Sequence, residues 1–221
     1  MKRGTAGSKH TAMPLSEIQL RTATIILALP EAAGFALAGG AALVIHEIVD
    51  RSTKDLDCFG PSTDAVNQLV DPTLDALAAA GLHTQLLLRA DGFSKIDVTD
   101  EHERTQVDLG FDPASHDPVR FAIGPVRHLS DLAGDKLLAL FSRAAARDFI
   151  DVAALLRRFT KPELCAIAEA KDQGFNIDAP ADAFGVLPTY DRDDEYPTLN
   201  DDDYHALTAV FAAWQREIRQ G

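Results

Sequence analysis

Residues 38–59 carry the sequence AGGAALVIHEIVDRSTKDLDCF, which joins a Gly-Gly pair and an apolar helix to an Asp-x-Asp pair. Just before this stretch, residues 35–37 (Phe-Ala-Leu) predict a short buried strand. Gly39 and Gly40 let the backbone approach a ligand closely, and residues 41–49 continue as an apolar helix. The first free N–H groups of such a helix point toward an anion, so we expect Gly39 and Gly40 to cradle a phosphate.

The second half of the stretch places two carboxylates on one edge of a strand. Residues 54–59 predict a strand, in which side chains alternate between faces. Asp55 and Asp57 therefore project the same way, while Leu56 and Cys58 project oppositely. Carboxylate oxygens and substrate phosphates are the ligands that Mg²⁺ prefers. With a third carboxylate, two metals about 3.5–4 Å apart would activate an attacking hydroxyl and stabilise a leaving pyrophosphate.

Each half of the stretch also has an ordinary structural interpretation. In an acidic protein, a single Asp-x-Asp is more often a solvated strand end than a metal site. A single Gly-Gly before an apolar helix is mostly a turn. The order strand, Gly-Gly, helix, basic turn and Asp-x-Asp in one run favours the functional interpretation, a site for a nucleoside triphosphate and its magnesium.

Two sets of residues resemble the motifs of a known family. The first set is Gly39-Gly40-x-Ala42-Leu43, His46 and Arg51-Ser52-Thr53-x-Asp55-Leu56-Asp57-x-Phe59. The second set is Lys136-Leu-Leu-Ala139-Leu140-x-x-Arg143, followed by Ala146-Arg147-Asp148-x-x-Asp151-x-x-x-Leu155. The first resembles the opening motif of the AbiEii-type nucleotidyltransferases, which include the MenT toxins of bacterial toxin–antitoxin pairs. The second resembles the C-terminal Lys and Arg-Asp motifs of the same family.

This resemblance implies a metal-dependent nucleotidyltransferase that uses Mg²⁺, or Mn²⁺ in its place. It implies that Asp55 and Asp57 are metal ligands and that Lys136 and Asp148 join them as catalytic residues. The residues expected to bind the nucleotide are Gly39, Gly40, Arg51, Thr53, Lys136 and Arg147.

A third carboxylate has to come from a neighbouring strand. Asp108 lies in residues 105–109 (Thr-Gln-Val-Asp-Leu), an apolar-flanked acid of the kind that completes the metal triad in nucleotidyltransferase folds. Asp97, in residues 95–98 (Lys-Ile-Asp-Val), is the rival, since a hairpin would set it on the same sheet. The sequence does not reveal the register, so both alternatives stay open. We take Asp108 as the catalytic and metal-binding acid; otherwise it is a hydrogen-bonded structural residue.

Basic residues follow on the C-terminal side. Lys136 lies early in a predicted helix, where its ammonium group would reach a triphosphate; the ordinary alternative is a surface lysine. Arg143 and Arg147 share a face with Lys136 if the helix is unbroken, although residues 144–146 are an alternative turn. The expected ion pairs are Arg147 with Asp148, and Asp151 with Arg143 or Lys136.

Composition limits the class of protein. The chain has 221 residues, 46% of them hydrophobic, and can bury the core of one large domain. Its two cysteines are too few for a disulfide framework and make no zinc pattern. No segment approaches the ~18 apolar residues of a membrane span, and the N-terminus has no signal-peptide pattern. A cytoplasmic location without membrane contact is therefore the expectation.

The net charge of −13 argues against a broad electrostatic grip on nucleic acid. Many of the acidic residues lie in residues 178–203, however, whereas Arg143, Arg147, Arg157 and Arg158 form a basic cluster. Such a basic strip would bind a phosphate backbone with weak and salt-sensitive affinity.

The predicted elements give an α+β fold: a nucleotidyltransferase-like mixed sheet with flanking helices and a C-terminal helical layer. The further predicted strands are 84–89, 93–99 and 104–111. The predicted helices outside the opening stretch are 15–29, 64–80, 132–145, 147–158, 163–172 and 201–219. Residues 178–200 are expected to be a wrapping connection, and Phe211 and Trp214 a packing face of the last helix. We expect residues 1–129 to form the core and residues 130–221 to pack on the active site, as one compact unit.

The resemblance completes the functional prediction. It implies transfer of a nucleoside monophosphate from a triphosphate, with CTP or another pyrimidine favoured, to the 3′ end of tRNA. Such a transfer blocks aminoacylation and translation, and a cognate antitoxin would neutralise it. A nucleotidyltransferase acting on a small molecule or a protein is one alternative, and a catalytically inactive binding module is the other. A phosphoryl group on Thr53 would repel the triphosphate and is a hypothetical means of neutralisation.

Overall fold

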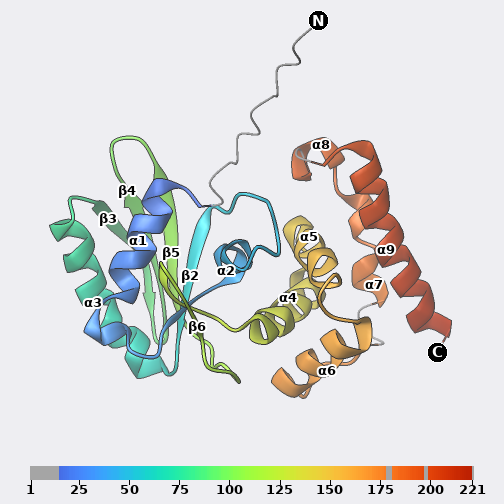
Figure 1. Cartoon of the computed structure of the whole chain (residues 1–221), viewed down its shortest axis with the longest axis horizontal. Helices are drawn as coiled ribbons and strands as arrows, with labels where there is room; N and C mark the ends of the chain where they lie inside the picture. The colour runs from blue at the N-terminus through green and yellow to red at the C-terminus, as the bar shows by residue number, and fades with distance from the viewer. Residues whose placement is uncertain (1–14, 178–180, 197–198, 221) are drawn as a thin grey trace, which may run out of the picture.

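A seven-stranded mixed sheet organises the part of the chain that the structure describes. The structure is a computed structural model and describes residues 15–177, 181–196 and 199–220. The strands run in the order β3-β4-β5-β2-β1-β7-β6 (Figure 1). Their bounds are β1 Ala36–Ala38, β2 Asp55–Gly60, β3 His83–Ala90, β4 Phe93–Thr99, β5 Arg104–Phe111, β6 Val119–Phe121 and β7 Gly124–Val126. The predicted α+β class is confirmed.

The helices fall into two groups. α1 (Glu17–Leu27) and α3 (Thr63–Ala79) pack on the sheet, and α2 (Gly39–Ile45) joins β1 to β2. The C-terminal group comprises α4 Leu129–Arg143, α5 Ala146–Leu155, α6 Lys161–Lys171, α7 Ala181–Phe184, α8 Arg192–Glu195 and α9 Asp201–Gln220. Short 3₁₀ turns are η1 Pro30–Ala32 and η2 Leu187–Thr189. Figure 1 shows the C-terminal group beyond α2, on the side away from α1 and α3. Within the described ranges, no helix is both long and apolar enough to cross a bilayer.

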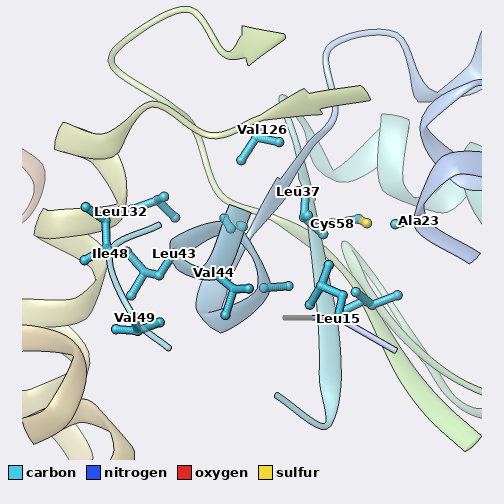
Figure 2. Close-up of a cluster of buried hydrophobic side chains, with 14 of the residues drawn as sticks. Leu15, Ala23, Leu37, Leu43, Val44, Ile48, Val49, Cys58, Val126 and Leu132 are labelled. Atoms are coloured by element: carbon cyan, nitrogen blue, oxygen red, sulfur yellow. The ribbon is translucent and has the colours of Figure 1, made fainter. Parts of the chain in front are cut away.

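The strand pairing of β2 brings distant residues together. β2 runs antiparallel to β1 and parallel to β5, and Asp57 lies directly opposite Asp108. Residues that face each other across neighbouring strands project from the same face of a sheet. Cys58 projects the other way, into a buried cluster that includes Ala23 of α1 (Figure 2). The two aspartates therefore lie on the face of the sheet that α1 does not cover.

The predicted strands agree with the structure to within one residue at each end. β6 and β7 are the exceptions, because the sequence does not predict them. Each has three residues, too few for alternation to show, and β7 contains Pro125. β7 pairs with β1 through Leu37 and Val126, a contact between distant parts of the chain that local pattern does not encode.

α2 is shorter than the helix predicted over residues 41–49. It ends at Ile45, and Glu47 then adopts a left-handed φ of 57°. The N–H of Ile48 donates to the carbonyl of Leu43, which is the hydrogen bond of a Schellman-type helix end. The chain therefore turns back toward β2 earlier than the apolar periodicity suggests.

The C-terminal region is helical, as predicted, with additional short elements. α7, η2 and α8 lie within residues 178–200, where a connection was expected; residues 178–180 and 197–198 of that stretch lie outside the described residues. In α9, Phe211 and Trp214 are buried, and the Phe211 ring lies 5.0 Å from that of Phe149. The interpretation of Phe211 and Trp214 as a packing face is confirmed.

α4 ties the helical group to the sheet. Leu132 of α4 belongs to the same buried cluster as Leu43 and Val44 of α2 (Figure 2). An ion-pair network adds polar contacts between the end of β5, α4 and α6; its members are Asp112, Arg127, Asp135 and Lys171. The sheet and the helical group thus pack against each other, while their division at residue 129 stays a prediction.

Candidate active site

A cavity of about 250 Å³ lies where β2, β4, β5, α2, α4 and α5 meet. Its lining residues are Gly40, Arg51, Thr53, Asp55, Asp57, Lys95, Asp108, Lys136, Arg143 and Arg147. All the site residues predicted from the sequence are in this set except two, Gly39 and Asp148. The structure therefore brings residues from both sequence motifs into one place.

Three carboxylates come from two adjacent strands. Asp55 and Asp57 alternate along β2, and the register sets Asp108 of β5 beside Asp57. Lys95 Nζ lies 2.9 Å from Oδ2 of Asp108, and the Gln106 side chain donates to Oδ1 at 3.2 Å. Asp108 thus lines the same cavity as Asp55 and Asp57.

Asp97 is placed differently. It is paired with Gln106 rather than with Asp108 in the β4–β5 register, and its Oδ1 accepts a hydrogen bond from Nε of Arg104 at 2.5 Å. It does not line the cavity of the three carboxylates. The geometry favours Asp108 over Asp97 as the third acid, and a role for Asp108 in catalysis belongs to the proposal below.

Two buried acids on α5 hold the basic residues in position. Asp151 accepts two hydrogen bonds from Arg51, at 2.8 and 2.7 Å, and its Oδ2 lies 2.8 Å from Nζ of Lys136. Asp148 accepts two hydrogen bonds from Arg143, at 2.8 and 2.9 Å. Both acids have fully buried side chains, so they lie behind the cations that face the cavity.

These contacts revise the predicted pairing. Asp148 was expected to pair with Arg147 but binds Arg143, and Arg147 instead lies 3.5 Å from Asp55. Asp151 holds Lys136, one of the two predicted partners, and also Arg51. The pairing differs because the backbone between Arg143 and Arg147 turns.

α4 ends at Arg143, because Ala144 adopts a left-handed φ of 47° and α5 starts at Ala146. The alternative of a turn at residues 144–146 is therefore the one observed. The predicted arginine cluster also divides, since Arg157 donates to the carbonyl of Ile48 rather than lining the cavity.

Glycines allow the backbone of α2 to approach the acids. Gly39 has φ +60°, and a Cβ there would lie 1.7 Å from Oδ2 of Asp57. At Gly40, a Cβ would lie 3.0 Å from Nη2 of Arg51 and 3.2 Å from Oγ1 of Thr53. Thr53 in turn donates from Oγ1 to Oδ1 of Asp55 at 3.0 Å. The two glycines thus keep open the space that Arg51, Thr53 and the acids share.

Burial acts differently on the pKa of two acids of the site, Asp57 and Asp151. Burial, together with the neighbouring charge of Asp55, raises the pKa of Asp57 to about 6. Burial also acts to raise the pKa of Asp151, but the charge of Lys136 and the hydrogen bond from Arg51 hold that pKa below its usual value. Asp151 is therefore a satisfied anion, whereas Asp57 is an acid that a cation would stabilise in its charged form.

The donor set fits a magnesium ion in chemistry and in backbone placement. Asp55, Asp57 and Asp108 supply hard oxygen donors from one face of the sheet. Among the described residues, no three such side chains converge on one point as they stand. Asp55 and Asp108 instead form ion pairs with Arg147 and Lys95.

A second hollow of about 520 Å³ adjoins the cavity and shares Arg51, Thr53, Arg143 and Arg147 with it. Asp194 and Glu195 of α8 line its other wall. The sequence did not predict this hollow, or the position of Lys95 in the cavity. The sequence feature that could have indicated Lys95 is alternation along β4, which places Lys95 and Asp97 on the same face of the sheet.

The family model for the nucleotidyl transferase AbiEii toxin, of type IV toxin–antitoxin systems, matches residues 24–210. The chain belongs to the AbiEii nucleotidyltransferase toxin family. The match covers both motifs and most of the helical region. Among the curated proteins, none is similar in sequence to this chain.

Solved structures share the AbiEii fold at low sequence identity. JHP933 from Helicobacter pylori has a TM-score of 0.55 and 16% identity, and the similarity covers 93% of this chain and 95% of JHP933. MenT4, a nucleotidyltransferase toxin from Mycobacterium tuberculosis H37Rv, has a TM-score of 0.52 and 15% identity, and the similarity covers 90% of this chain and 79% of MenT4. The similarity to JHP933 and MenT4 therefore spans both the sheet and the helical group of this AbiEii member.

Proposed function

We propose that the protein transfers a nucleoside monophosphate from a nucleoside triphosphate to the 3′ hydroxyl of an RNA, with tRNA as the acceptor and CTP as the favoured donor. The observation that carries the proposal is one cavity in which three carboxylates face four basic side chains from α2–β2, α4 and α5. Membership of the AbiEii family supports the reaction class. The choice of tRNA and of CTP rests on the resemblance to MenT toxins.

The proposed reaction is an in-line displacement at the α-phosphorus. The acceptor oxygen forms a new bond to that phosphorus, the bond to the oxygen bridging the α- and β-phosphates breaks, and pyrophosphate leaves. A carboxylate oxygen of Asp108 takes the proton of the attacking hydroxyl. Magnesium held by Asp55, Asp57 and Asp108 would polarise the phosphates and stabilise the charge of the leaving group.

The basic side chains bind and orient the triphosphate in this proposal. Lys136, Arg51 and Arg143 are held in place by buried acids, so little side-chain freedom is lost when phosphate oxygens bind. Arg147, which lies 3.5 Å from Asp55, would contact a phosphate oxygen of the bound triphosphate. Asp148 touches no open space in the cavity, and we assign it a positioning role through Arg143 rather than a direct catalytic one.

The biological consequence follows from the acceptor. A nucleotide added to the 3′ end of tRNA blocks aminoacylation and so stops translation, which makes the enzyme a toxin that a cognate antitoxin must neutralise. The net charge of −13 favours a different acceptor, a small molecule, because no polyanion then has to bind. The salt dependence of acceptor binding separates these two functions.

The test is incubation of the purified protein with total tRNA, Mg²⁺ and each labelled nucleoside triphosphate in turn. Label on tRNA with the wild type, but not with an Asp55→Ala/Asp57→Ala double variant, is the expected result. Triphosphate binding without any labelled tRNA would contradict the RNA acceptor, and absence of metal-dependent triphosphate binding would contradict the enzyme.

A further inference from the structure

A row of side chains leads away from the carboxylates toward the edge of the sheet. The register sets Asp57 opposite Asp108, Asp108 opposite Lys95, and Lys95 opposite Leu88 of β3. Neighbouring strands lie about 4.8 Å apart, so Lys95 lies roughly 10 Å from Asp57 along this row. The row projects from the face opposite Arg89, which reaches Asp71 of α3 on the other side of the sheet.

The row has a direction with respect to the proposed reaction. Arg51, Lys136, Arg143 and Arg147 approach the acids from the side of α2, α4 and α5, whereas Lys95 approaches from β4. In an in-line displacement, the attacking and leaving oxygens lie on opposite sides of the phosphorus. If the four other cations hold the triphosphate and its leaving pyrophosphate, the acceptor must arrive over Asp108 from the side of Lys95.

The surface beyond Asp108 has the chemistry of a nucleotide-binding platform. Lys95 Nζ lies 5.9 Å from the centroid of the half-buried Phe93 ring. Gly110 lies opposite both Phe93 and Phe59, and a Cβ there would lie 3.1 Å from the Phe59 ring and 3.6 Å from the Phe93 ring, so the two rings lie close together over this glycine. Leu88 is 47% exposed at the outer end of the row, so this part of the sheet stays open. A positive charge beside an aromatic face is the combination that binds one phosphate and one base of a single strand.

We propose that Lys95 and Phe93 form the acceptor subsite for the 3′ end of a single-stranded nucleic acid, a proposal that rests on the proposed function. Lys95 contacts the phosphate preceding the terminal nucleotide, and Phe93 stacks on a base. In the free protein Lys95 neutralises Asp108, and it moves to the acceptor phosphate when the strand binds, which frees Asp108 for the hydroxyl proton. Because Lys95 would contact the acceptor through its positive charge, the subsite favours an anionic acceptor.

The experiment measures binding of a 5′-labelled single-stranded RNA oligonucleotide by fluorescence anisotropy, with Mg²⁺ and a non-hydrolysable triphosphate present. The variants are Lys95→Gln, Lys95→Arg and Phe93→Leu. Arg89→Gln is the matched control, because it removes one positive charge from the same sheet on the opposite face.

We expect Lys95→Gln to weaken oligonucleotide binding about ten-fold and to reduce the slope of log affinity against log salt by about 0.7. Lys95→Arg should restore most of the affinity, and Phe93→Leu should weaken binding about ten-fold with little change in the salt slope. Arg89→Gln should bind like the wild type. In transfer assays, Lys95→Gln should raise the KM for the acceptor and leave the KM for the triphosphate within about two-fold.

Other results would overturn the subsite. Equal loss in Lys95→Gln and Arg89→Gln would mean a general charge effect, and a raised KM for the triphosphate alone would place Lys95 on the donor side. A wild type that binds no oligonucleotide also overturns it. The proposed function is judged separately, since metal-dependent triphosphate binding and its loss in the Asp55→Ala/Asp57→Ala variant do not involve the acceptor.

Discussion

At the scale of single residues, Gly39 is subject to two separate constraints. Its φ of +60° is costly for a residue with a Cβ, and an added Cβ would lie 1.7 Å from Oδ2 of Asp57. Gly81 shares only the first constraint, since its φ is +79° but no atom lies within 4 Å of an added Cβ. Comparing an alanine substitution at Gly39 with one at Gly81 therefore separates the effect of backbone strain from the effect of displacing Asp57.

We expect Gly39→Ala to abolish transferase activity and metal-dependent triphosphate binding, because Asp57 must move. Gly81→Ala should cost about 1–2 kcal/mol of unfolding free energy and leave activity within about two-fold of the wild type. The measurements are triphosphate binding by calorimetry and unfolding in urea. Full activity in Gly39→Ala would show that the position of Asp57 is not critical.

Thr53 lies close enough to the acids for its charge state to matter. Its Oγ1 lies 3.0 Å from Oδ1 of Asp55, so Thr53→Glu places another carboxylate beside the proposed metal ligands. We expect activity to fall at least a hundred-fold, as a phosphoryl group would cause, whereas Thr53→Val should keep most of it. A kinetic assay at saturating Mg²⁺ checks this, and an active Thr53→Glu protein would count against silencing through Thr53.

At the scale of elements, α5 positions the cations of α4 and of the loop before β2. Asp151 lies on α5 and binds both Lys136 and Arg51 while fully buried. Asp151→Asn leaves these two cations short of a negative partner. We expect a loss of about 3–5 kcal/mol in the free energy of unfolding, the range measured when one partner of a buried ion pair is removed.

The pH dependence of that loss has a defined sign. The pKa of Asp151 is lowered in the folded state, so its contribution to stability is present above its unfolded value, about 3.9, and is lost as the pH falls through the folded value. The difference in unfolding free energy between wild type and Asp151→Asn should therefore be constant near neutral pH and shrink below pH about 4. Urea unfolding across this range measures it, and a difference that grows on acidification would contradict the sign.

Elements with a local signal could be predicted from the sequence, and contacts between them could not. The strand and glycine pattern from residue 35 to residue 60 fixes where Asp55 and Asp57 point, because alternation is a local property. The contact between Arg51 and Asp151 joins residues 100 positions apart, and the sequence around Arg51 does not predict this partner. The choice of Asp108 over Asp97 likewise depended on the register of β5 against β2, which the side-chain pattern does not encode.

At the scale of the whole molecule, the protein is acidic while its proposed site is lined by five basic side chains. A polyanion is thus attracted over a short range and repelled by much of the remaining surface. We expect the KM for an RNA acceptor to rise steeply between about 50 and 200 mM salt, with the KM for the triphosphate rising less. Initial rates at several salt concentrations test this, and an acceptor KM independent of salt would favour a small neutral acceptor.

The fold explains why one site needs both parts of the molecule. The sheet supplies the acids and Lys95, and the helical group supplies Lys136, Arg143 and Arg147. Neither part has the whole set, so the contact between them is a condition for the proposed chemistry.

The most direct measurement is the intact mass of tRNA after incubation with the protein, Mg²⁺ and all four nucleoside triphosphates, together with the pyrophosphate released. We predict a mass gain of one or more nucleoside monophosphates at the 3′ end, one pyrophosphate for each, and neither product with the Asp55→Ala/Asp57→Ala variant. Unchanged tRNA with no pyrophosphate from the folded wild type would contradict the proposed transfer to tRNA.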